Sequence, residues 1–182
     1  VDGLANLLVN TYGVKKGDRV AVAMRNYPEW VMSFAAIISI GAVNVSMNSW
    51  WTEDEMDFAL VDSGATVLIC DQQRYDIGAE SCAKHGVKVL VARAEKPLPA
   101  NVDKWEVMVK PGAPHPGADI QPDDDATILY TSGTTGRPKG AVSTHRAIIS
   151  ALMAFSARNG VLTMSGTKLK DVVGPEVPTS FI

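Results

Sequence analysis

The sequence predicts an α/β fold in which a mostly parallel β-sheet carries helices on both faces. Helical and strand-like segments alternate through the first half of the chain, and the strand-like runs are short and apolar, as is typical of buried strands. Parallel neighbours need a connection of helix length, so this alternation favours right-handed β–α–β crossovers. The 182 residues are 46% hydrophobic and 20% charged, which indicates an ordinary globular protein with one substantial core.

The predicted elements of the first half follow from local signals. We expect, in chain order, a helix over 1–14, a strand over 19–24, a helix over 28–40, a strand over 42–47, a helix from Thr52 to about 62, a strand over 66–70, a helix over 72–85 and a strand over 87–92. Pro28 and Glu29 suit a first helical turn, because proline is tolerated there and a carboxylate favours the positive end of the helix dipole. Thr52 and Glu55 have the spacing of a capping box, and Gly86 follows a helix end.

One long stretch has the length of a membrane span. No charged residue stands between Glu29 and Glu53, and length alone would permit a transmembrane helix. Gly41 divides the stretch into a helical part and an alternating part, and no basic flank is present. We therefore expect a buried helix followed by a buried strand, with no transmembrane segment and no signal peptide.

The second half of the chain changes character. Residues 95–125 are rich in Pro, Gly, Asp and Ala apart from a short run at 105–109, and they predict a long surface connection. After it we expect an entry strand over 126–131, an exit strand over 140–144, and a helix from 145 to about 158 whose buried side carries Ile148, Ile149, Leu152 and Phe155. The predicted divisions are a first α/β subdomain over 1–94, the connection over 95–125, and the start of a second subdomain over 126–182.

Charge and cysteine usage narrow the function classes. The net charge is −3 and the Lys and Arg residues are scattered, so nucleic acid is not an expected partner. Cys70 and Cys82 belong to no CxxC or His/Cys cluster, which argues against a zinc motif or a disulfide framework and fits a reducing, cytoplasmic setting. The acidic run at 123–125 is expected to form a turn, and no metal ligand is predicted in the chain.

The strongest chemical signal comes from residues 130–140, YTSGTTGRPKG, between the entry and exit strands. Glycines in this run can adopt positive φ, so successive backbone N–H groups can point at a phosphate, and the hydroxyl groups add uncharged donors. Lys139 adds a positive charge. The candidate phosphate-binding residues are Thr131, Ser132, Gly133, Thr134, Thr135, Gly136 and Lys139. A plain Gly/Ser/Thr hairpin turn would explain the glycines, but not the four hydroxyl groups, the proline and the lysine together.

Two better-known phosphate motifs do not fit these residues. A Walker loop requires Gly-Lys at its end, whereas Pro138 stands five positions after Gly133 and the order that follows is Lys139-Gly140. The dinucleotide fingerprint requires Gly-x-Gly, and no two glycines of the chain are separated by one residue. Neither a Walker loop nor a Rossmann cofactor site is predicted.

The run 130–140 resembles, almost letter for letter, the phosphate-binding signature of the adenylate-forming ligases. This superfamily comprises the acyl-CoA synthetases, the adenylation domains of peptide synthetases and the luciferases. Weaker strings between residues 13 and 70 occur in the same order as in the acyl-CoA synthetases, namely GVKKGDRVAVAMRN, PEW, GAVNVSMN and LVDSGATVLIC. One departure is visible at 46–49, where the family commonly has proline and this chain has none.

The resemblance implies a two-step chemistry. A carboxylate attacks the α-phosphate of ATP to give an acyl-adenylate and pyrophosphate, and a thiol such as coenzyme A then displaces AMP. In that scheme the signature holds the β- and γ-phosphates, and the intact protein uses a small carboxylic acid, ATP, Mg²⁺ and coenzyme A. Lys139 and its neighbours would position and neutralise phosphate rather than act as nucleophile or base.

The resemblance also implies that the chain is a fragment of the large N-terminal domain of such an enzyme. The family's Tyr-Gly-x-Thr-Glu stretch, its ribose-binding aspartate and its catalytic C-terminal lysine have no counterpart in these residues. The rest of the N-terminal domain and the C-terminal domain would be missing, so no catalytic residue is predicted within the chain. Two alternatives stay open: a non-catalytic nucleotide-binding or interaction module, and an enzyme that keeps the adenylation chemistry but continues with a carrier-protein thiol or an oxidative step in place of coenzyme A.

Overall fold

The computed structural model describes residues 1–131 and 138–165, and the chain forms two compact units, Val1–His145 and Arg146–Ile182. The elements are, in chain order, α1 (Asp2–Asn10), β1 (Arg19–Ala23), α2 (Pro28–Ser39), β2 (Val43–Ser46), α3 (Glu53–Ser63), β3 (Val67–Asp71), α4 (Gln72–His85), β4 (Lys88–Ala92), β5 (Asp103–Lys104), α5 (Trp105–Met108), β6 (Asp125–Thr131), β7 (Lys139–Thr144) and α6 (His145–Met164). Every helix and strand predicted over 1–94 is present, with ends that differ by a few residues. The largest difference is in α1, which ends at Asn10.

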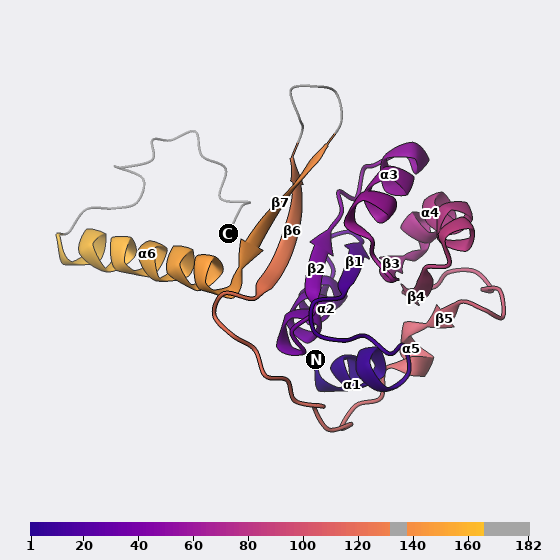
Figure 1. Ribbon diagram of the computed structural model, residues 1–182, viewed down its shortest axis with the longest axis horizontal. Helices are drawn as coiled ribbons and strands as arrows, with labels where there is room; N and C mark the ends of the chain where they lie inside the picture. The colour runs from indigo at the N-terminus through magenta and orange to yellow at the C-terminus, as the bar shows by residue number, and fades with distance from the viewer. Residues whose placement is uncertain (132–137, 166–182) are drawn as a thin grey trace. The chain divides into compact units, whose positions relative to one another are not determined.

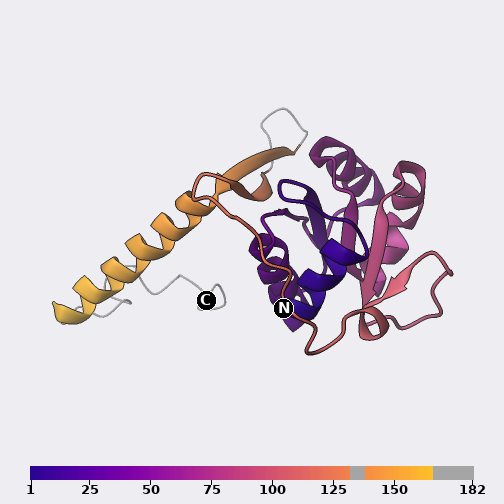
Figure 2. The same cartoon turned by 60° about the horizontal axis from the view of Figure 1, so that its bottom comes forward.

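The strands of the first unit form one seven-stranded sheet in the order β5-β4-β3-β1-β2-β6-β7 (Figure 1). All neighbours are parallel except β6 and β7, which form an antiparallel hairpin at one edge. Helices α1, α2 and α5 contribute to the core on one face of the sheet, and α3 and α4 to the core on the other (Figure 2). The predicted mostly parallel α/β fold with helices on both faces is confirmed.

Successive residues of the central strands alternate between these two cores. On β1, Val20 and Val22 pack with α1 and α2, whereas Ala21 and Ala23 pack with α3 and α4. Both faces of the sheet are therefore covered by helices and shielded from water. For this reason the strands are continuous apolar runs in the sequence, without alternating polar residues. Strand β3 is buried at every position, and β1 at every position after Arg19, because helices cover both faces of the sheet there.

Local signals in the sequence predicted several helix ends correctly. The capping box at the start of α3 is present, and the Thr52 backbone N–H donates to Glu55 Oε2 at 2.8 Å. Gly86 ends α4 as predicted, in the left-handed conformation that favours glycine, and Gly64, which was not predicted as a helix end, ends α3 in the same conformation. The charge-free stretch after Glu29 forms α2 and β2 as expected, and among the described residues no helix is both long and apolar enough to cross a membrane.

The connection over 95–125 is only partly the surface segment that its composition predicts. It contains β5, which extends the sheet beyond β4, and the short helix α5. Trp105 of α5 is buried in the same core as residues of α1 and α2, because removing its large apolar side chain from water is favourable in free energy. The chain then crosses to the other end of the sheet, where β6 pairs with β2. The division at 95–125 into two subdomains stays a prediction.

Helix α1 approaches the same connection so closely that its first turn has no room for a side chain. A Cβ added at Gly3 would lie 2.2 Å from the carbonyl oxygen of Lys110. We therefore expect Gly3→Ala to lower the free energy of unfolding of the chain by about 1–3 kcal/mol through overpacking. Urea unfolding followed by circular dichroism measures the change. In Gly160→Ala, the matched control in α6, the new methyl group meets open space. An unfolding midpoint for Gly3→Ala at or above that of the wild type would contradict the expected clash.

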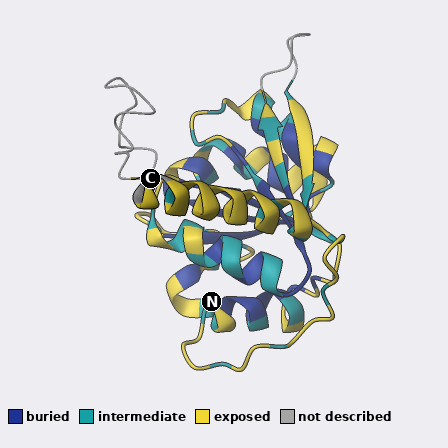
Figure 3. Cartoon of the chain, turned by 90° about the vertical axis from the view of Figure 1, so that its left-hand side faces the viewer, coloured by how far each residue is buried: buried dark blue, intermediate teal, exposed yellow. Residues whose placement is uncertain are grey.

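Helix α6 differs from the expectation in length and in burial. It runs to Met164, and the side expected to be buried is largely open to solvent, since Ile149, Leu152 and Phe155 are each more than half exposed (Figure 3). The expected burial is wrong for this chain. The periodic pattern identified the apolar residues of α6 correctly, but among the described residues of its own unit, Arg146–Ile182, no other helix or strand is present to cover them.

Candidate functional site

Strand β6, which precedes the predicted phosphate loop in the sequence, ends at the carboxyl edge of the parallel sheet. Strands β1 to β4 and β6 run in the same direction, so their carboxyl ends lie along this one edge. Residues Ser132, Gly133, Thr134, Thr135 and Gly136 lie outside the described residues. In open α/β sheets, ligands bind in the crevice outside the carboxyl ends of the strands, so the entry point of the loop has the location expected of a binding site.

The structure brings the first and last candidate residues of the loop together at its base. Thr131 and Lys139 are cross-strand partners in the β6–β7 ladder, and Thr131 Oγ1 donates to the Lys139 carbonyl oxygen at 3.4 Å. Both side chains are exposed. No ion pair joins Lys139 to a residue that the structure describes, so its ammonium group is not neutralised there. The roles of these residues as phosphate ligands stay predictions.

The strand that enters the loop is attached to the C-terminal turn of α3. The hydroxyl of Tyr130 donates to Asp62 Oδ2 at 2.7 Å, and its ring meets that of Trp51 edge to face with centroids 5.6 Å apart. Burial, together with the bond to the Asp62 carboxylate, raises the pKa of Tyr130 well above its usual value. The sequence contains no signal for this contact, because 68 residues separate the two partners.

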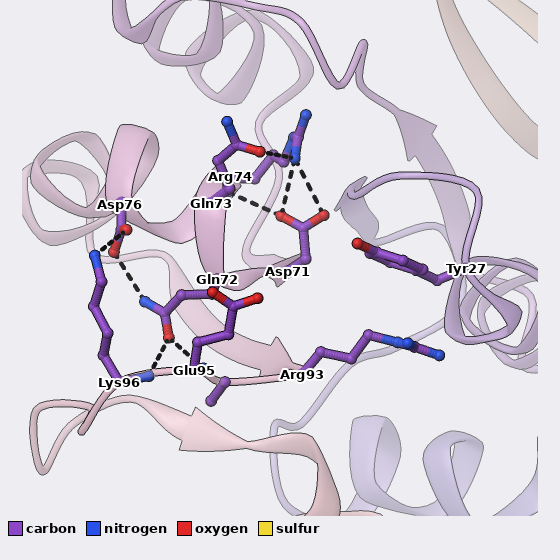
Figure 4. A pocket seen from close by; sticks show the side chains of 10 residues that line it. Tyr27, Asp71, Gln72, Gln73, Arg74, Asp76, Arg93, Glu95 and Lys96 are labelled. Carbon is purple, nitrogen blue, oxygen red and sulfur yellow. Dashed lines mark hydrogen bonds and ion pairs between the residues drawn. The ribbon is translucent and has the colours of Figure 1, made fainter.

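A pocket of about 510 Å³ opens farther along the same edge, where β3 and β4 end and α4 begins (Figure 4). Its lining consists of Tyr27, Asp71, Gln72, Gln73, Arg74, Asp76, Arg93, Ala94, Glu95 and Lys96. Sequence reasoning did not single out this pocket. Its lining includes Tyr27, which follows β1, and Asp71, which ends β3. From these neighbouring strands the chain continues in opposite directions across the sheet, and open α/β folds place their crevice at such a point.

A buried ion pair forms the inner wall of this pocket. Asp71 accepts hydrogen bonds from the backbone N–H groups of Arg25 and Arg74, at 3.1 and 3.0 Å, and pairs with the Arg74 guanidinium at 3.3 Å. The same guanidinium donates from Nε to the carbonyl oxygen of Ser49 at 2.8 Å. Arg74 is 2% exposed and Asp71 is 5% exposed. Four segments therefore meet here: the ends of β1 and β3, the first turn of α4, and the segment after β2.

The rim of the pocket carries paired charges. Lys96 Nζ lies 2.7 Å from Asp76 Oδ2, and this hydrogen bond lowers the pKa of Asp76 and raises that of Lys96. Arg93 pairs with Glu29 at 3.1 Å and stacks over the ring of Tyr27 at 4.3 Å. Two cations and two anions compensate each other in these pairs, so the rim is polar without a strong net charge.

The described residues offer no metal centre. No group of three or more His, Cys, Asp or Glu side chains is arranged among them to hold an ion. Of the acidic run at 123–125, Asp123 and Asp124 lie in the predicted turn, in which the Asp124 backbone N–H donates to the Gln121 carbonyl oxygen at 3.0 Å, whereas Asp125 is the first residue of β6. The Asp124 carboxylate pairs with Lys16 at 2.7 Å, and this bond lowers its pKa. Asp124 directly precedes β6, so it lies at the amino end of that strand, whereas the phosphate signature follows its carboxyl end.

Comparisons with known proteins agree with the fold and with the resemblance to the adenylate-forming ligases. The chain is 34% identical over 157 residues to the long-chain-fatty-acid–CoA ligase FadD13 of Mycobacterium tuberculosis, a match that covers 82% of this chain and 29% of that protein. A crystal structure from Rhodopseudomonas palustris, described as a long-chain-fatty-acid CoA ligase, superposes with a TM-score of 0.75 at 24% identity and supports the fold. That superposition covers 86% of this chain and 39% of the other.

A second solved structure is more similar in sequence. The anthranilate CoA ligase AuaEII, in complex with anthranoyl-AMP, superposes with a TM-score of 0.68 at 28% identity, over 79% of this chain and 29% of that one. The chain therefore spans less than two fifths of the length of each of these three proteins. The family model described as AMP-binding enzyme matches residues 1–182. The chain thus belongs to the AMP-binding enzyme family, the adenylate-forming ligases.

Proposed function

We propose that the chain is part of the N-terminal domain of an acyl-CoA synthetase, which converts a carboxylic acid and ATP to an acyl-adenylate and pyrophosphate and then forms a thioester with coenzyme A. The observation that carries this proposal is the placement of Thr131 and Lys139 side by side, at the base of a Gly/Ser/Thr-rich loop on the carboxyl edge of a parallel sheet. Membership of the AMP-binding family supports the proposal that this loop holds nucleotide phosphate.

In this reaction the loop would act on the leaving group. A carboxylate oxygen bonds to the α-phosphorus of ATP, the bond from that phosphorus to the bridging oxygen breaks, and pyrophosphate leaves with the bonding pair. The Lys139 ammonium and the loop's N–H and hydroxyl donors are suited to hold the β- and γ-phosphates and to stabilise the charge that develops on them. Lys139 has no proton to accept in this step and is not assigned as a base.

Magnesium ion, when bound to ATP, neutralises phosphate charge in such reactions. It usually takes one or two protein carboxylates in addition to phosphate oxygens. No Mg²⁺ ligand is assigned among the described residues, where no three or more His, Cys, Asp or Glu side chains are grouped to hold an ion. A cytosolic location is part of the proposal, and two free thiols, Cys70 and Cys82, buried in the core support it.

Coenzyme A is the proposed acceptor because the named relatives are CoA ligases. The acid is left as a class, since one relative is named for long-chain fatty acids and another for anthranilate. A module that only binds nucleotide would show no pyrophosphate exchange in the experiment that follows. A carrier-protein thiol as acceptor would leave that exchange unchanged and would show as AMP release that coenzyme A does not stimulate.

We expect the 182-residue chain alone to form no acyl-adenylate, whereas the full-length protein exchanges labelled pyrophosphate into ATP when supplied with its acid. The reason is that the chain contributes a phosphate-holding element and, in its described part, no other reacting group. Exchange and AMP release are measured for both proteins with a panel of fatty and aromatic acids. Robust AMP release by the isolated chain would overturn this expectation. No exchange by the full-length protein with any acid, together with tight ATP binding by the chain in calorimetry, would favour the binding module.

A further inference from the structure

The base of the phosphate loop has two different faces. Thr131 and Lys139 project from one face of the β6–β7 hairpin, and Tyr130, the residue before Thr131, projects from the other, toward α3. Because neighbouring residues of a strand point to opposite sides, any force that fixes the Tyr130 side chain also fixes the backbone from which Thr131 projects. The contacts of Tyr130 therefore bear on the position of the loop, although the side chain points away from it.

Tyr130 is held from three directions. Its hydroxyl donates to Asp62 Oδ2 at 2.7 Å and lies 3.4 Å from the Ala59 carbonyl oxygen, both near the end of α3. Its ring contacts that of Trp51 edge to face. Its cross-strand partner is Gly140, the last residue of the signature.

Position 140 has little room for a side chain. A Cβ at this position would lie 2.9 Å from Ile128 Cγ2 and 3.5 Å from Cζ of the Tyr130 ring. The ring thus packs over Gly140, so one aromatic side chain of β6 also contacts β7. Its hydroxyl group reaches a third element, α3. The entry and exit strands of the loop are in this way attached together to the helical layer.

We propose that Tyr130 is a positioning residue for Thr131 and Lys139, the two candidate phosphate ligands that the structure describes, and that its hydroxyl bond to Asp62 sets where they lie at the carboxyl ends of the strands. The role rests on the proposed function, since it concerns how well Lys139 meets the phosphates of ATP. Tyr130 itself touches no reacting atom, because its side chain lies on the face opposite to Lys139. A misplacement of about 1 Å is enough to cost up to about 100-fold in rate in a well-oriented site.

The test compares Tyr130→Phe with Tyr12→Phe in the full-length protein. Tyr12 is a matched control, because its hydroxyl also donates to an aspartate, Asp103 Oδ2, at 2.7 Å, far from the phosphate loop. Both variants keep the ring and lose one tyrosine–aspartate bond. For Tyr130→Phe we expect kcat/KM for ATP in pyrophosphate exchange to fall about tenfold, while KM for the acid is unchanged. Tyr12→Phe keeps both values. Asp62→Ala should reproduce the Tyr130→Phe effect, and the double variant should be no worse than either single variant.

A second measurement does not depend on activity. Hydrogen–deuterium exchange at the backbone amides of residues 139–141 should become faster in Tyr130→Phe than in the wild type or Tyr12→Phe. If the wild type exchanges pyrophosphate but Tyr130→Phe matches Tyr12→Phe in kinetics and in amide exchange, the positioning role is wrong and the proposed function stands. If the wild type is inactive, the proposed function fails, and the amide exchange alone decides whether Tyr130 anchors the hairpin.

Discussion

Lys139→Ala is expected to reduce ATP–pyrophosphate exchange by the full-length protein by about 100-fold or more. Removal of a single preorganised donor to developing charge typically has an effect of this size. Lys139 is exposed at the start of an edge strand, and its ammonium group is not neutralised by any described residue. Initial rates at saturating acid, with ATP and pyrophosphate varied in turn, measure the loss.

The chain offers a close control for this substitution. Lys104 is an exposed lysine in β5, the strand at the other edge of the sheet. Lys104→Ala should leave exchange unchanged, and both variants should unfold within about 0.5 kcal/mol of the wild type, as is usual for exposed side chains. If Lys139→Ala exchanges pyrophosphate at the same rate as Lys104→Ala, Lys139 does not bind phosphate, and the assignment of the whole loop as a phosphate site is weakened.

The largest loss of stability is expected for Arg74→Ala, at about 3–5 kcal/mol in the free energy of unfolding. The substitution leaves the Asp71 carboxylate buried without its cation and removes the hydrogen bonds that the guanidinium donates to the Ser49 carbonyl oxygen. An uncompensated buried charge is costly because the interior solvates it poorly. Urea unfolding of the chain, followed by tryptophan fluorescence and circular dichroism, gives the change.

Two further variants separate charge burial from loss of packing. Arg93→Ala, on the exposed rim of the same pocket, removes a surface pair with Glu29 and should cost at most about 1 kcal/mol. Asp71→Asn combined with Arg74→Met removes both charges while keeping an N-cap oxygen and a long apolar stem, and it should recover much of the stability. If the double variant is as unstable as Arg74→Ala, then packing rather than the orphaned carboxylate accounts for the loss.

Features encoded by neighbouring residues were predictable from the sequence, and contacts between distant residues were not. The capping box of Thr52 and Glu55 and the end of α4 at Gly86 each depend on a few consecutive residues. The pairing of Asn44 in β2 with Thr127 in β6 joins segments that share no pattern. Strand order therefore came from the structure, although the parallel class was predictable from alternation.

The same distinction applies to the candidate site. Thr131 and Lys139 belong to one continuous signature, so both were identified from the sequence as candidates. The partner of Tyr130 on α3 and the carbonyl group of Ser49 that binds Arg74 are distant in the chain and were not identified. For α6, periodicity identified the apolar face but carried no information on what covers it.

The position of β6 has a consequence for the order in which the sheet is completed during synthesis. During synthesis the N-terminal part of a chain is made first and can begin to fold first. Strands β1 to β5 are all complete once residue 104 has been added. At that stage β2 is an outer strand with open N–H and C=O groups, which is a template for pairing with other chains. Only when residues 127–129 are made can β6 occupy this edge. The strand that leads into the phosphate signature is thus also the one that covers the open edge of β2.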